Sequence, residues 1–540
     1  MIDHDSFFSE LCLLLGEDYL VVNKDEVEKL ARVTIHKRVL PIAFAYPENT
    51  VQAQQIILLA TKYKIPLWVA SRGNNWGYGA ATPFKENSLV VILERMNKII
   101  EVNEELAYAV IEAGVSYEQL NRYLKENNIN LWIDCTDGTP NGSVIGNAME
   151  RGIGETPYGD HFGSLCGLEV ILPDSTIIHT GGSSPNHPLK TWHLHKWGIG
   201  PYLEGIFTQS NFGIVTKAGI WLMPKPQAFQ SYVFELRRED KFAEVIDAFR
   251  KLALQGIVNT KLHMINDFVS LTVLTQKNKE IIKGKDYLTD DDLKSLRNKY
   301  KVAPWSGGGG LYGTKDELRV QRKIMHKELG KYGRLMFLND TMLWGLSKLV
   351  LLSKKCRFLE TMIRLFGNTS IDMLESAPYV HGILQGIPTE YFVNHAYYKH
   401  PLPRPTRDVH PARDNCGLIW FAPILPMSGQ RVTAFLDLCK TKYQEYGFDF
   451  YVAMLMLNPR SVVPLMSIIF DRETELEKAG ELYDALLELM YKNNYQQYRA
   501  GVQSWEHLFD HAPEYASLNE KIKKALDPEN ILAPGKYGIS

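Results

Sequence analysis

Two glycine-rich loops in the first third of the chain place the tightest limits on its fold. The first loop, residues 71–79, follows a short apolar run, and the second extends from residue 140 to residue 161. Glycine allows backbone N–H groups to approach an anion without obstruction by a side chain, as a pyrophosphate group requires. Because apolar runs bound both loops, we expect them to form one shared cofactor site in preference to ordinary turns.

Short β-branched runs alternate with helical patterns around these loops, which predicts a layered domain containing both helices and strands. Residues 66–70, 89–93 and 108–112 are the expected strands. The second of them is apolar throughout, as in a strand that is covered on both faces. A helix is expected to begin after a cap at Asn49 or Thr50.

The regular pattern breaks at the Pro-Lys-Pro sequence of residues 224–226, which indicates a domain boundary. Beyond it, Gly308, Gly310 and Gly313 match the spacing of the dinucleotide-binding fingerprint. However, Pro304 lies where a central strand would have to lead into the turn. We therefore interpret this cluster as a glycine-rich loop.

Composition and charge exclude several classes of protein. The chain has 540 residues, of which 45% are apolar and 23% charged, so it can bury a large core and is expected to form two or three domains. Its 60 Lys and Arg against 62 Asp and Glu give a formal net charge of -2, without the excess positive charge of a dedicated nucleic-acid binder. The N-terminus has no basic segment, and the apolar residues 11–15 are too few for an export signal or a membrane span. We expect a cytoplasmic protein that binds neither nucleic acid nor membrane.

Metal and hydrolase chemistry are not suggested by any motif. The six cysteines are scattered without a C-x-x-C pair, which favours reduced thiols over a disulfide framework or a zinc site. His193 and His195 would share one face of an extended segment, but no third ligand is clustered with them, so we interpret them as surface or core residues and expect no metal. The sequence motifs of nucleotide hydrolases, zinc proteases, esterases and EF-hand proteins are absent.

Five segments in the same order along the chain carry a family resemblance. Residues 71–79, 142–152, 156–161, 209–217 and 527–536 together resemble the vanillyl-alcohol oxidase and p-cresol methylhydroxylase flavoprotein family. The resemblance implies an α+β fold in which a p-cresol-methylhydroxylase-type FAD-binding domain is built from an N-terminal part and a C-terminal tail. An antiparallel-sheet cap domain would lie over the flavin. The implied division is 1–226 for the N-terminal FAD part, 227–472 for the cap, and 473–540 for the segment that completes the FAD domain and the active site.

The implied cofactor is FAD, and its expected contacts come from both loops, a later strand and the tail. They are Ser71, Arg72, Gly73, Asn74, Asn75, Pro140, Ser143, Gly146, Asn147, Gly152, Gly154, Tyr158, Gly159, Gly213, Ile214, Val215, Arg499 and Lys536. Leu418 stands where the oxidase has the histidine that bonds the flavin, and leucine cannot form that bond. His410 and Cys416 nearby have suitable nucleophilic atoms, and non-covalent FAD is an equal alternative.

The resemblance also implies a site for a phenol. Tyr78, Tyr498 and Arg499 match the family's phenol-binding trio. A fixed positive charge with hydrogen bonds to the anionic form lowers the pKa of a phenol, and the phenolate then pushes electrons toward its para carbon. Asp137 matches the family's acidic residue near flavin N5, and Asp134 competes for this assignment because the local lengths differ by one residue.

Departures from the family pattern bear on the substrate. Glu155 replaces a pocket tyrosine, and residues 458–463 lack the paired histidines of the oxidase. Trp420 and Trp76 are expected to wall the pocket, with core packing an equal reading for Trp420.

The expected function is that of an FAD-dependent oxidase or dehydrogenase acting on CH-OH or CH2 groups. It would oxidise the benzylic carbon of 4-alkylphenols or 4-hydroxybenzyl alcohols by hydride transfer to flavin N5 through a para-quinone methide. The alternatives are a larger alcohol, an alkaloid or a secondary metabolite, or a flavin-binding subunit without a substrate of its own. Dioxygen or an electron-acceptor protein would reoxidise the flavin, and the resemblance favours a dimer or a larger assembly.

Overall fold

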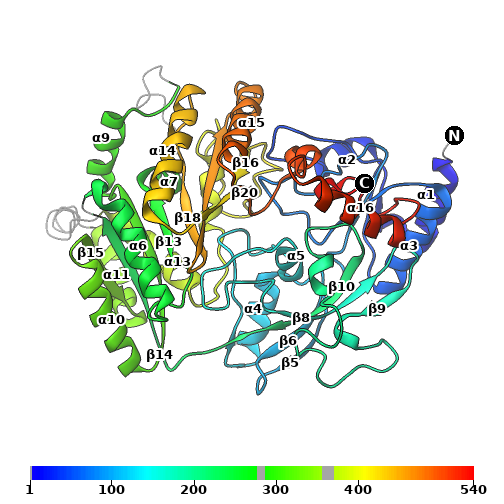
Figure 1. The fold of residues 1–540 in the computed structure, drawn as a ribbon, viewed down its shortest axis with the longest axis horizontal. Coiled ribbons are helices and arrows are strands. Elements are labelled where there is room, and N and C mark those ends of the chain that lie inside the picture. The colour runs from blue at the N-terminus through cyan, green and yellow to red at the C-terminus, as the bar shows by residue number, and fades with distance from the viewer. Residues whose placement is uncertain (1–2, 237, 277–285, 356–369) are drawn as a thin grey trace.

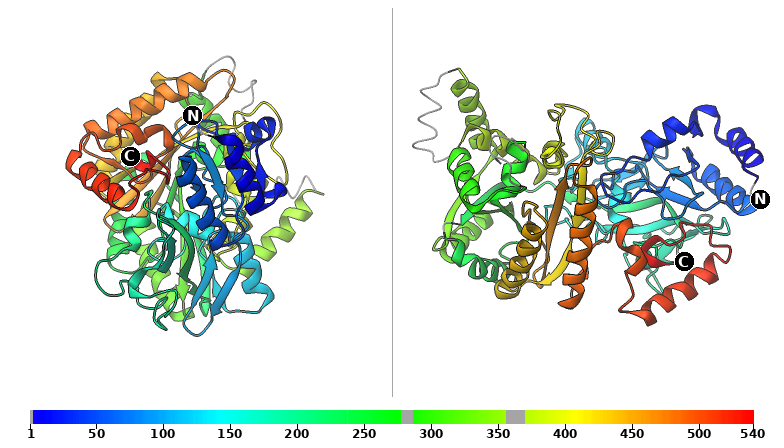
Figure 2. Two further views of the ribbon diagram at one scale, coloured as in Figure 1. Left: turned by 90° about the vertical axis from the view of Figure 1, so that its right-hand side faces the viewer. Right: turned by 90° about the horizontal axis from the view of Figure 1, so that it is seen from above.

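The computed structural model describes residues 3–236, 238–276, 286–355 and 370–540 (Figure 1). It divides into two units that lie side by side along its longest axis. The two-sheet unit contains both chain termini and two small sheets, and the large-sheet unit contains one extensive antiparallel sheet (Figures 1 and 2). The expected α+β class with a separate antiparallel sheet is confirmed.

The first sheet of the two-sheet unit has the strand order β1-β2-β4-β3. Its strands are β1 (Leu20–Val21), β2 (Ala43–Ala45), β3 (Leu67–Ala70) and β4 (Leu89–Ile92), and β2, β3 and β4 are parallel. Helix α3 (Thr50–Tyr63) buries one apolar stripe and begins after Asn49, whose side chain accepts from Gln52 N. Helix α1 (His4–Leu15) packs on α3, and α2 (Lys24–Leu30) follows β1. All four residues of β4 are buried, as an uninterrupted apolar strand predicts.

The second sheet of this unit is antiparallel, with the order β5-β6-β10-β8-β9. Its strands are β5 (Ile99–Asn103), β6 (Tyr108–Glu112), β8 (Leu165–Ile171), β9 (Ile177–His179) and β10 (Ile214–Trp221). Helices α4 (Tyr117–Glu126) and α5 (Val144–Met149) lie between β6 and β8 in sequence, and β7 (Leu131–Trp132) pairs with β11 (Met223–Pro224). Ser116 caps α4 by accepting from Gln119 N, as the sequence predicts.

The large sheet has the order β15-β12-β14-β13-β18-β19-β17-β20, and β16 also pairs with β19. The strands are β12 (Ala228–Leu236), β13 (His263–Asn266), β14 (Trp305–Gly313), β15 (Gly333–Leu338), β16 (Gly417–Phe421), β17 (Pro423–Pro426), β18 (Ala453–Asn458), β19 (Ser461–Phe470) and β20 (Gln496–Gln497). Helices α6 (Phe242–Leu254), α10 (Lys315–Leu329), α14 (Gly429–Glu445) and α15 (Leu476–Lys492) pack with one face of this sheet in a shared apolar core. The remaining described helices are α7 (Asp267–Leu274), α9 (Asp290–Tyr300), α11 (Asp340–Ser353), α13 (Ile371–Ile383) and α16 (Pro513–Leu526).

The interpretation of the glycine cluster as a loop is wrong, because Gly308, Gly310 and Gly313 all lie in β14, a strand between β12 and β13. Glycine is required here because aromatic side chains of the sheet occupy the space. A Cβ atom at Gly310 would collide with the hydroxyl group of Tyr312. Pro304 precedes the strand, where its missing N–H group costs no hydrogen bond of the sheet.

The C-terminal tail returns to the first sheet. Leu67 N donates to Ile531 O at 2.8 Å, and Ala533 N donates to Leu67 O at 2.7 Å, so the tail extends the sheet beside β3. By contrast, α15 and β20 pack on the large sheet. The division at residues 226 and 472 stays a prediction, and the last segment contributes to both units.

Candidate cofactor and substrate site

A cleft of about 230 Å³ opens where the end of β3 meets the start of β10, helix α5 and the C-terminal tail. Most of the expected cofactor residues line it. They are Ser71, Arg72, Gly73, Asn74, Asn75, Ser143, Gly146, Asn147, Gly213, Ile214, Val215, Arg499 and Lys536. The lining does not include Pro140, Gly152, Gly154, Tyr158 or Gly159.

The first loop presents unpaired backbone donors to this cleft. Within the described chain, the N–H groups of residues 72–75 donate to no backbone carbonyl outside regular elements and to no side chain. Gly73 has a φ of 69°, a conformation that other residues rarely adopt. A run of free N–H groups in a glycine turn is a typical cradle for an anion.

The second loop is held tightly against the first. Ser143 begins α5 by accepting from Gly146 N at 2.8 Å, and its hydroxyl donates to Ala113 O at 2.6 Å. A Cβ atom at Gly146 would lie 2.7 Å from Ser71 Oγ, so only glycine allows the two loops to meet. The predicted association of the two loops is therefore present in the structure.

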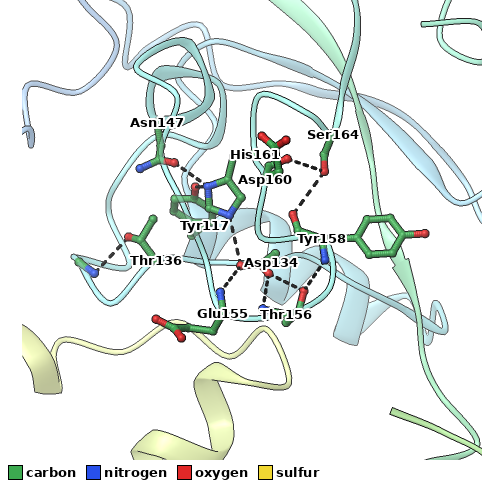
Figure 3. A network of polar contacts seen from close by, with 11 residues as sticks. Tyr117, Asp134, Thr136, Asn147, Glu155, Thr156, Tyr158, Asp160, His161 and Ser164 are labelled. Carbon is green, nitrogen blue, oxygen red and sulfur yellow. Dashed lines mark hydrogen bonds and ion pairs between the residues drawn. The ribbon is translucent and has the colours of Figure 1, made fainter. Parts of the chain in front are cut away.

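Asp134 anchors the rest of the second loop (Figure 3). Its carboxylate accepts from Glu155 N at 3.2 Å and from Thr156 N at 2.7 Å, and it lies 3.2 Å from His161 Nε2. The Thr156 hydroxyl also donates to it. These four contacts saturate Asp134, whereas no hydrogen bond in the described structure engages the carboxylate of Asp137. The geometry therefore favours Asp137 over Asp134 as the chemically available acid.

The remaining glycines of the second loop surround this anchor instead of the cleft. A Cβ atom at Gly154 would collide with the Asp134 carboxylate, and one at Gly152 would collide with the Asn147 side chain. Gly154 N donates to Gly159 O at 2.9 Å, which closes the turn. Their requirement for glycine is explained by close packing.

The three residues matched to the phenol-binding trio lie close together, and Tyr78 and Arg499 line the cleft, whereas Tyr498 does not. The guanidinium of Arg499 lies over the ring of Tyr78, 5.1 Å from its centroid. Arg499 Nε donates to Glu150 O at 3.0 Å, and Nη1 donates to the Asn75 side chain at 3.4 Å. The Tyr498 hydroxyl donates to the carbonyl oxygen of Arg151 at 2.5 Å.

Burial controls the protonation of this group. It raises the pKa of the Tyr498 hydroxyl to about 12, against the opposing effect of the Arg499 charge. Burial likewise raises the pKa of Tyr78, again with Arg499 acting in the opposite direction. Both tyrosines are therefore neutral hydrogen-bonding groups, and Arg499 supplies the positive charge.

A second polar cluster lies under the large sheet and was missed in part from the sequence. Glu155 is 5% exposed, and His263 Nδ1 of β13 lies 3.6 Å from its Oε1 atom. Burial and the neighbouring Asp137 and Asp134 raise the pKa of Glu155 well above its ordinary value, which favours the protonated carboxyl. Asp137 also acts on His395: burial lowers the pKa of this imidazole, and the hydrogen bond to Phe392 O and the charge of Asp137 act in the opposite direction.

His263 and His395 had no local sequence signal. The alternation of β13 puts Met264 into the core under the helices and His263 on the opposite face. His395 lies in the 3-10 helix η5 (Tyr391–Tyr397), in a segment without regular periodicity. The packing of elements in the large-sheet unit brings both histidines within the electrostatic influence of Asp137.

Known proteins resemble this chain over nearly its whole length. The family model described as FAD binding domain matches residues 41–181. The chain is 32% identical over 504 residues to the 1'-carboxy-chondrochloren decarboxylase of Chondromyces crocatus, covering 92% of this chain and 90% of the relative. It is 30% identical to the flavoprotein subunit of the hydroxylating 4-cresol dehydrogenase of Pseudomonas putida, covering 97% and 94%. The crystal structure of p-cresol methylhydroxylase with substrate bound matches with a TM-score of 0.87 and 27% identity, over 99% of this chain and 97% of that one.

The chain belongs to the p-cresol methylhydroxylase-type flavoprotein family. It is an FAD-dependent oxidoreductase. The cleft fits this cofactor, because buried polar atoms that line it have no partner within the described protein. They are Arg72 Nε, Ser210 Oγ and Asn211 Oδ1. Ser210 and Asn211 were not among the expected contacts, although they lie inside the segment 209–217 that carries the resemblance.

The flavoprotein's candidates for a covalent flavin link lie outside the residues that line the cleft. The ring of His410 lies 5.0 Å from that of Trp76, and burial raises the pKa of the Cys416 thiol. Leu418 is buried in a cluster that packs against Trp420. Covalent attachment at His410 or Cys416 stays a prediction.

Trp420 of β16 connects the large-sheet unit to the first glycine-rich loop of the flavoprotein. Its backbone N–H donates to Gly77 O at 3.1 Å, and its ring occupies the space that a Cβ atom at Gly77 would need.

Within the described ranges, no helix has the length and apolar character needed to cross a membrane. The same part of the chain has no group of three His, Cys, Asp or Glu side chains placed to hold a metal ion.

Proposed function

We propose that this flavoprotein oxidises the benzylic carbon of para-substituted phenols. The observation that carries the proposal is the Arg499 guanidinium, which lies over Tyr78 in the lining of the cofactor cleft. FAD, when bound, supplies the acceptor for a hydride. A cation beside the phenol oxygen stabilises the phenolate, whose electrons favour loss of hydride from the para substituent.

The protein groups around the para substituent would then decide the product. Loss of hydride leaves a para-quinone methide, which is electrophilic at the benzylic carbon. Addition of water at that carbon gives an alcohol, and a second oxidation gives a carbonyl compound. The carboxylate of Asp137 has no hydrogen bond in the described structure and acts electrostatically on both Glu155 and His395, which supports a role in proton transfer at this carbon, either as the acceptor or by stabilising the group that accepts the proton.

The test uses the FAD-loaded protein without oxygen. A panel of 4-alkylphenols and 4-hydroxybenzyl alcohols is mixed with it, and bleaching of the flavin absorbance is followed. The matched controls are the O-methyl ethers of the same compounds, which cannot form a phenolate and should leave the flavin oxidised. If no phenol bleached the flavin, or if the ethers bleached it equally well, the proposal would be wrong.

A second candidate reaction is oxidative decarboxylation of a larger 4-hydroxyphenyl compound. It is favoured by the 32% identity to a protein named as a decarboxylase. If the carbon next to the benzylic carbon carries a carboxylate, loss of hydride can be followed by loss of CO2. The broken C–C bond then supplies the electron pair of a new double bond, and the ring returns to a phenolate.

The two reactions give different products from comparable substrates. Water addition yields a benzylic alcohol, whereas decarboxylation yields an alkene and one CO2 for each flavin reduced. Measurement of CO2 with a 3-(4-hydroxyphenyl)propanoate-type substrate separates them. Reoxidation by dioxygen or by an acceptor protein is tested by comparing oxygen consumption with the reduction of an artificial electron acceptor.

A further inference from the structure

His395 has one nitrogen that is engaged and one that is free. Its Nδ1 atom lies 2.7 Å from the carbonyl oxygen of Phe392. A carbonyl oxygen only accepts hydrogen bonds, so Nδ1 carries the proton that makes this bond. In the neutral ring, Nε2 then carries a lone pair.

The Nε2 atom is buried and has no hydrogen-bond partner in the described structure. The ring of His395 lies 5.3 Å from that of Trp420 and 5.5 Å from that of Tyr451. A buried acceptor without a partner is unfavourable, and such atoms are found where a ligand or water completes them. Trp420 also donates its backbone N–H to Gly77 O, one residue before Tyr78, so a chain of contacts joins the free lone pair to the phenol-binding residues.

The surroundings keep this imidazole neutral but able to accept a proton. Burial lowers its pKa, and Asp137 is the charged side chain that acts on it in the opposite direction. Helix α7 packs on η5, but its Asp267 lies 3.6 Å from Arg297 and is engaged there. Glu155 is the less suitable acceptor, because burial and the neighbouring carboxylates raise its pKa and favour its protonated form. Asp137 would stabilise the imidazolium that forms once Nε2 takes a proton.

We propose that Nε2 of His395 accepts the proton of the water molecule that adds to the substrate's benzylic carbon. The inference rests on the proposed phenol oxidation. In this step the water oxygen forms a bond to the benzylic carbon of the para-quinone methide. The exocyclic double-bond pair moves into the ring, which becomes an aromatic phenolate, and the water proton moves to Nε2. Asp137 is then a positioning residue that stabilises the charged ring.

The test separates hydride transfer from water addition in the FAD-loaded protein. A phenol that bleaches the wild-type flavin is mixed anaerobically with wild type and with His395→Gln. Flavin bleaching should keep about its wild-type rate, whereas the absorbance of the quinone methide should decay about a hundredfold more slowly in the variant. Mass analysis of the product formed in isotopically labelled water reports how much oxygen was added.

Two further readouts distinguish a base from a structural residue. Added imidazole should restore water addition in His395→Ala, because it can occupy the space of the missing ring. In wild type, the rate of water addition should fall at low pH, because His395 must be neutral to accept a proton. Burial lowers the pKa of His395, so this fall should be centred below the ordinary histidine pKa of 6.5. The pH dependence should be absent from His395→Gln.

His193→Gln is the matched control. His193 also has its Nδ1 atom 2.8 Å from a backbone carbonyl, that of Cys166, and burial also lowers its pKa, but it packs beside β6 and β8. It should behave as wild type in every readout. If His395→Gln added water at the wild-type rate, or lost bleaching and water addition together, the role of His395 as a base would be wrong. If wild type were not bleached by any phenol, the proposed function would fail, and the role of His395 with it.

Discussion

Arg499 is held by acceptors that leave its charge unneutralised. Its hydrogen bonds go to two backbone carbonyls and to one amide side chain, and the described structure places no carboxylate in salt-bridge contact with it. Burial lowers the pKa of its guanidinium, but the effects that raise this pKa, chiefly those of Tyr498 and Glu150, are larger in sum. The group therefore stays charged. A buried cation of this kind favours an anionic ligand atom.

Replacement of Arg499 by alanine is expected to reduce kcat/KM for a reactive phenol at least about tenfold, since a charge-assisted contact at a developing anion contributes roughly 2–4 kcal/mol. The pKa of a bound phenolic inhibitor, read from its absorbance, should rise as well. Arg95→Ala is the control, because Arg95 lies over Tyr19 in a comparable stack, 3.2 Å from the ring centroid, outside the cleft. Equal effects of the two substitutions on the inhibitor's pKa would contradict the assignment.

Glu155 predicts a dependence of stability on pH. Its folded pKa is raised above the ordinary 4.5, so the folded state holds a proton that the unfolded chain releases as the pH rises. Above pH 4.5 the free energy of unfolding of wild type falls by about 1.4 kcal/mol per pH unit relative to that of Glu155→Gln. This fall ends when the pH reaches the raised pKa of the folded state. The urea midpoints of the two proteins should coincide near pH 4 and diverge toward neutral pH in favour of the variant. Glu529→Gln changes an exposed carboxyl and should leave the midpoint unchanged; a constant difference at all pH values for Glu155→Gln would contradict the expectation.

Residues whose role is set by their own segment could be placed from the sequence. Ser71 and Gly146 line the cleft because each belongs to a glycine-rich loop with a recognisable pattern. His263 and His395 could not be placed in this way, because strand register and the packing of η5 bring them to Asp137. Neither the strand register nor the packing of η5 can be predicted from the residues next to each histidine in the sequence.

At the scale of elements, β14 shows how composition can mislead. Its glycines suggested a loop, yet the strand pairs over its length with β12 and in part with β13. The side chains that fill the sheet here belong to neighbouring positions, such as Tyr232 and Tyr312. The residue type at one position does not show that a side chain from a neighbouring position fills the space beside it.

The two glycines Gly310 and Gly307 give a matched test within this strand. A Cβ atom at Gly310 would collide with the Tyr312 hydroxyl, which is held in place by its hydrogen bond to Leu384 O at 2.7 Å. At Gly307 the nearest atom would lie at an ordinary 3.5 Å. Gly310→Ala should therefore cost about 1–3 kcal/mol of unfolding free energy, and Gly307→Ala should cost little. Urea unfolding measures both, and equal stabilities would show that the ring moves freely.

At the scale of the molecule, the cofactor cleft depends on the last residues of the chain. Leu532, Ala533 and Lys536 form part of its wall, and the tail is joined to β3 by backbone hydrogen bonds. Asp527 fixes the turn before them, because its carboxylate accepts from Ile531 N at 3.0 Å and from Leu532 N at 2.8 Å. The order of the five family segments along the sequence predicted that the tail belongs to the FAD-binding unit. These segments did not predict the ion pair that holds the tail in place.

The ion pair that holds the tail joins Lys523 of α16 to Asp527, and its removal can be tested. Lys523 and Asp527 are 1% and 3% exposed, and Lys523 Nζ lies 2.6 Å from Asp527 Oδ2. Asp527→Asn leaves the lysine charge buried without a counter-ion, which costs about 3–5 kcal/mol when the partner of a buried pair is removed. Since the tail also forms the cleft wall, FAD should dissociate more readily as the unfolding midpoint falls, and flavin fluorescence with urea unfolding follows both.

The double variant Lys523→Met with Asp527→Asn distinguishes the charge from the turn. It removes the uncompensated cation and should recover much of the lost stability, because a buried pair can be replaced by uncharged groups at little cost. Asp510→Asn is the surface control, since Asp510 pairs with His507 where both side chains are largely exposed, and it should change the free energy of unfolding by less than about 0.5 kcal/mol. If the double variant released FAD as readily as the single variant while regaining stability, the hydrogen bonds of Asp527 to the tail, and not the charge balance, would determine cofactor retention.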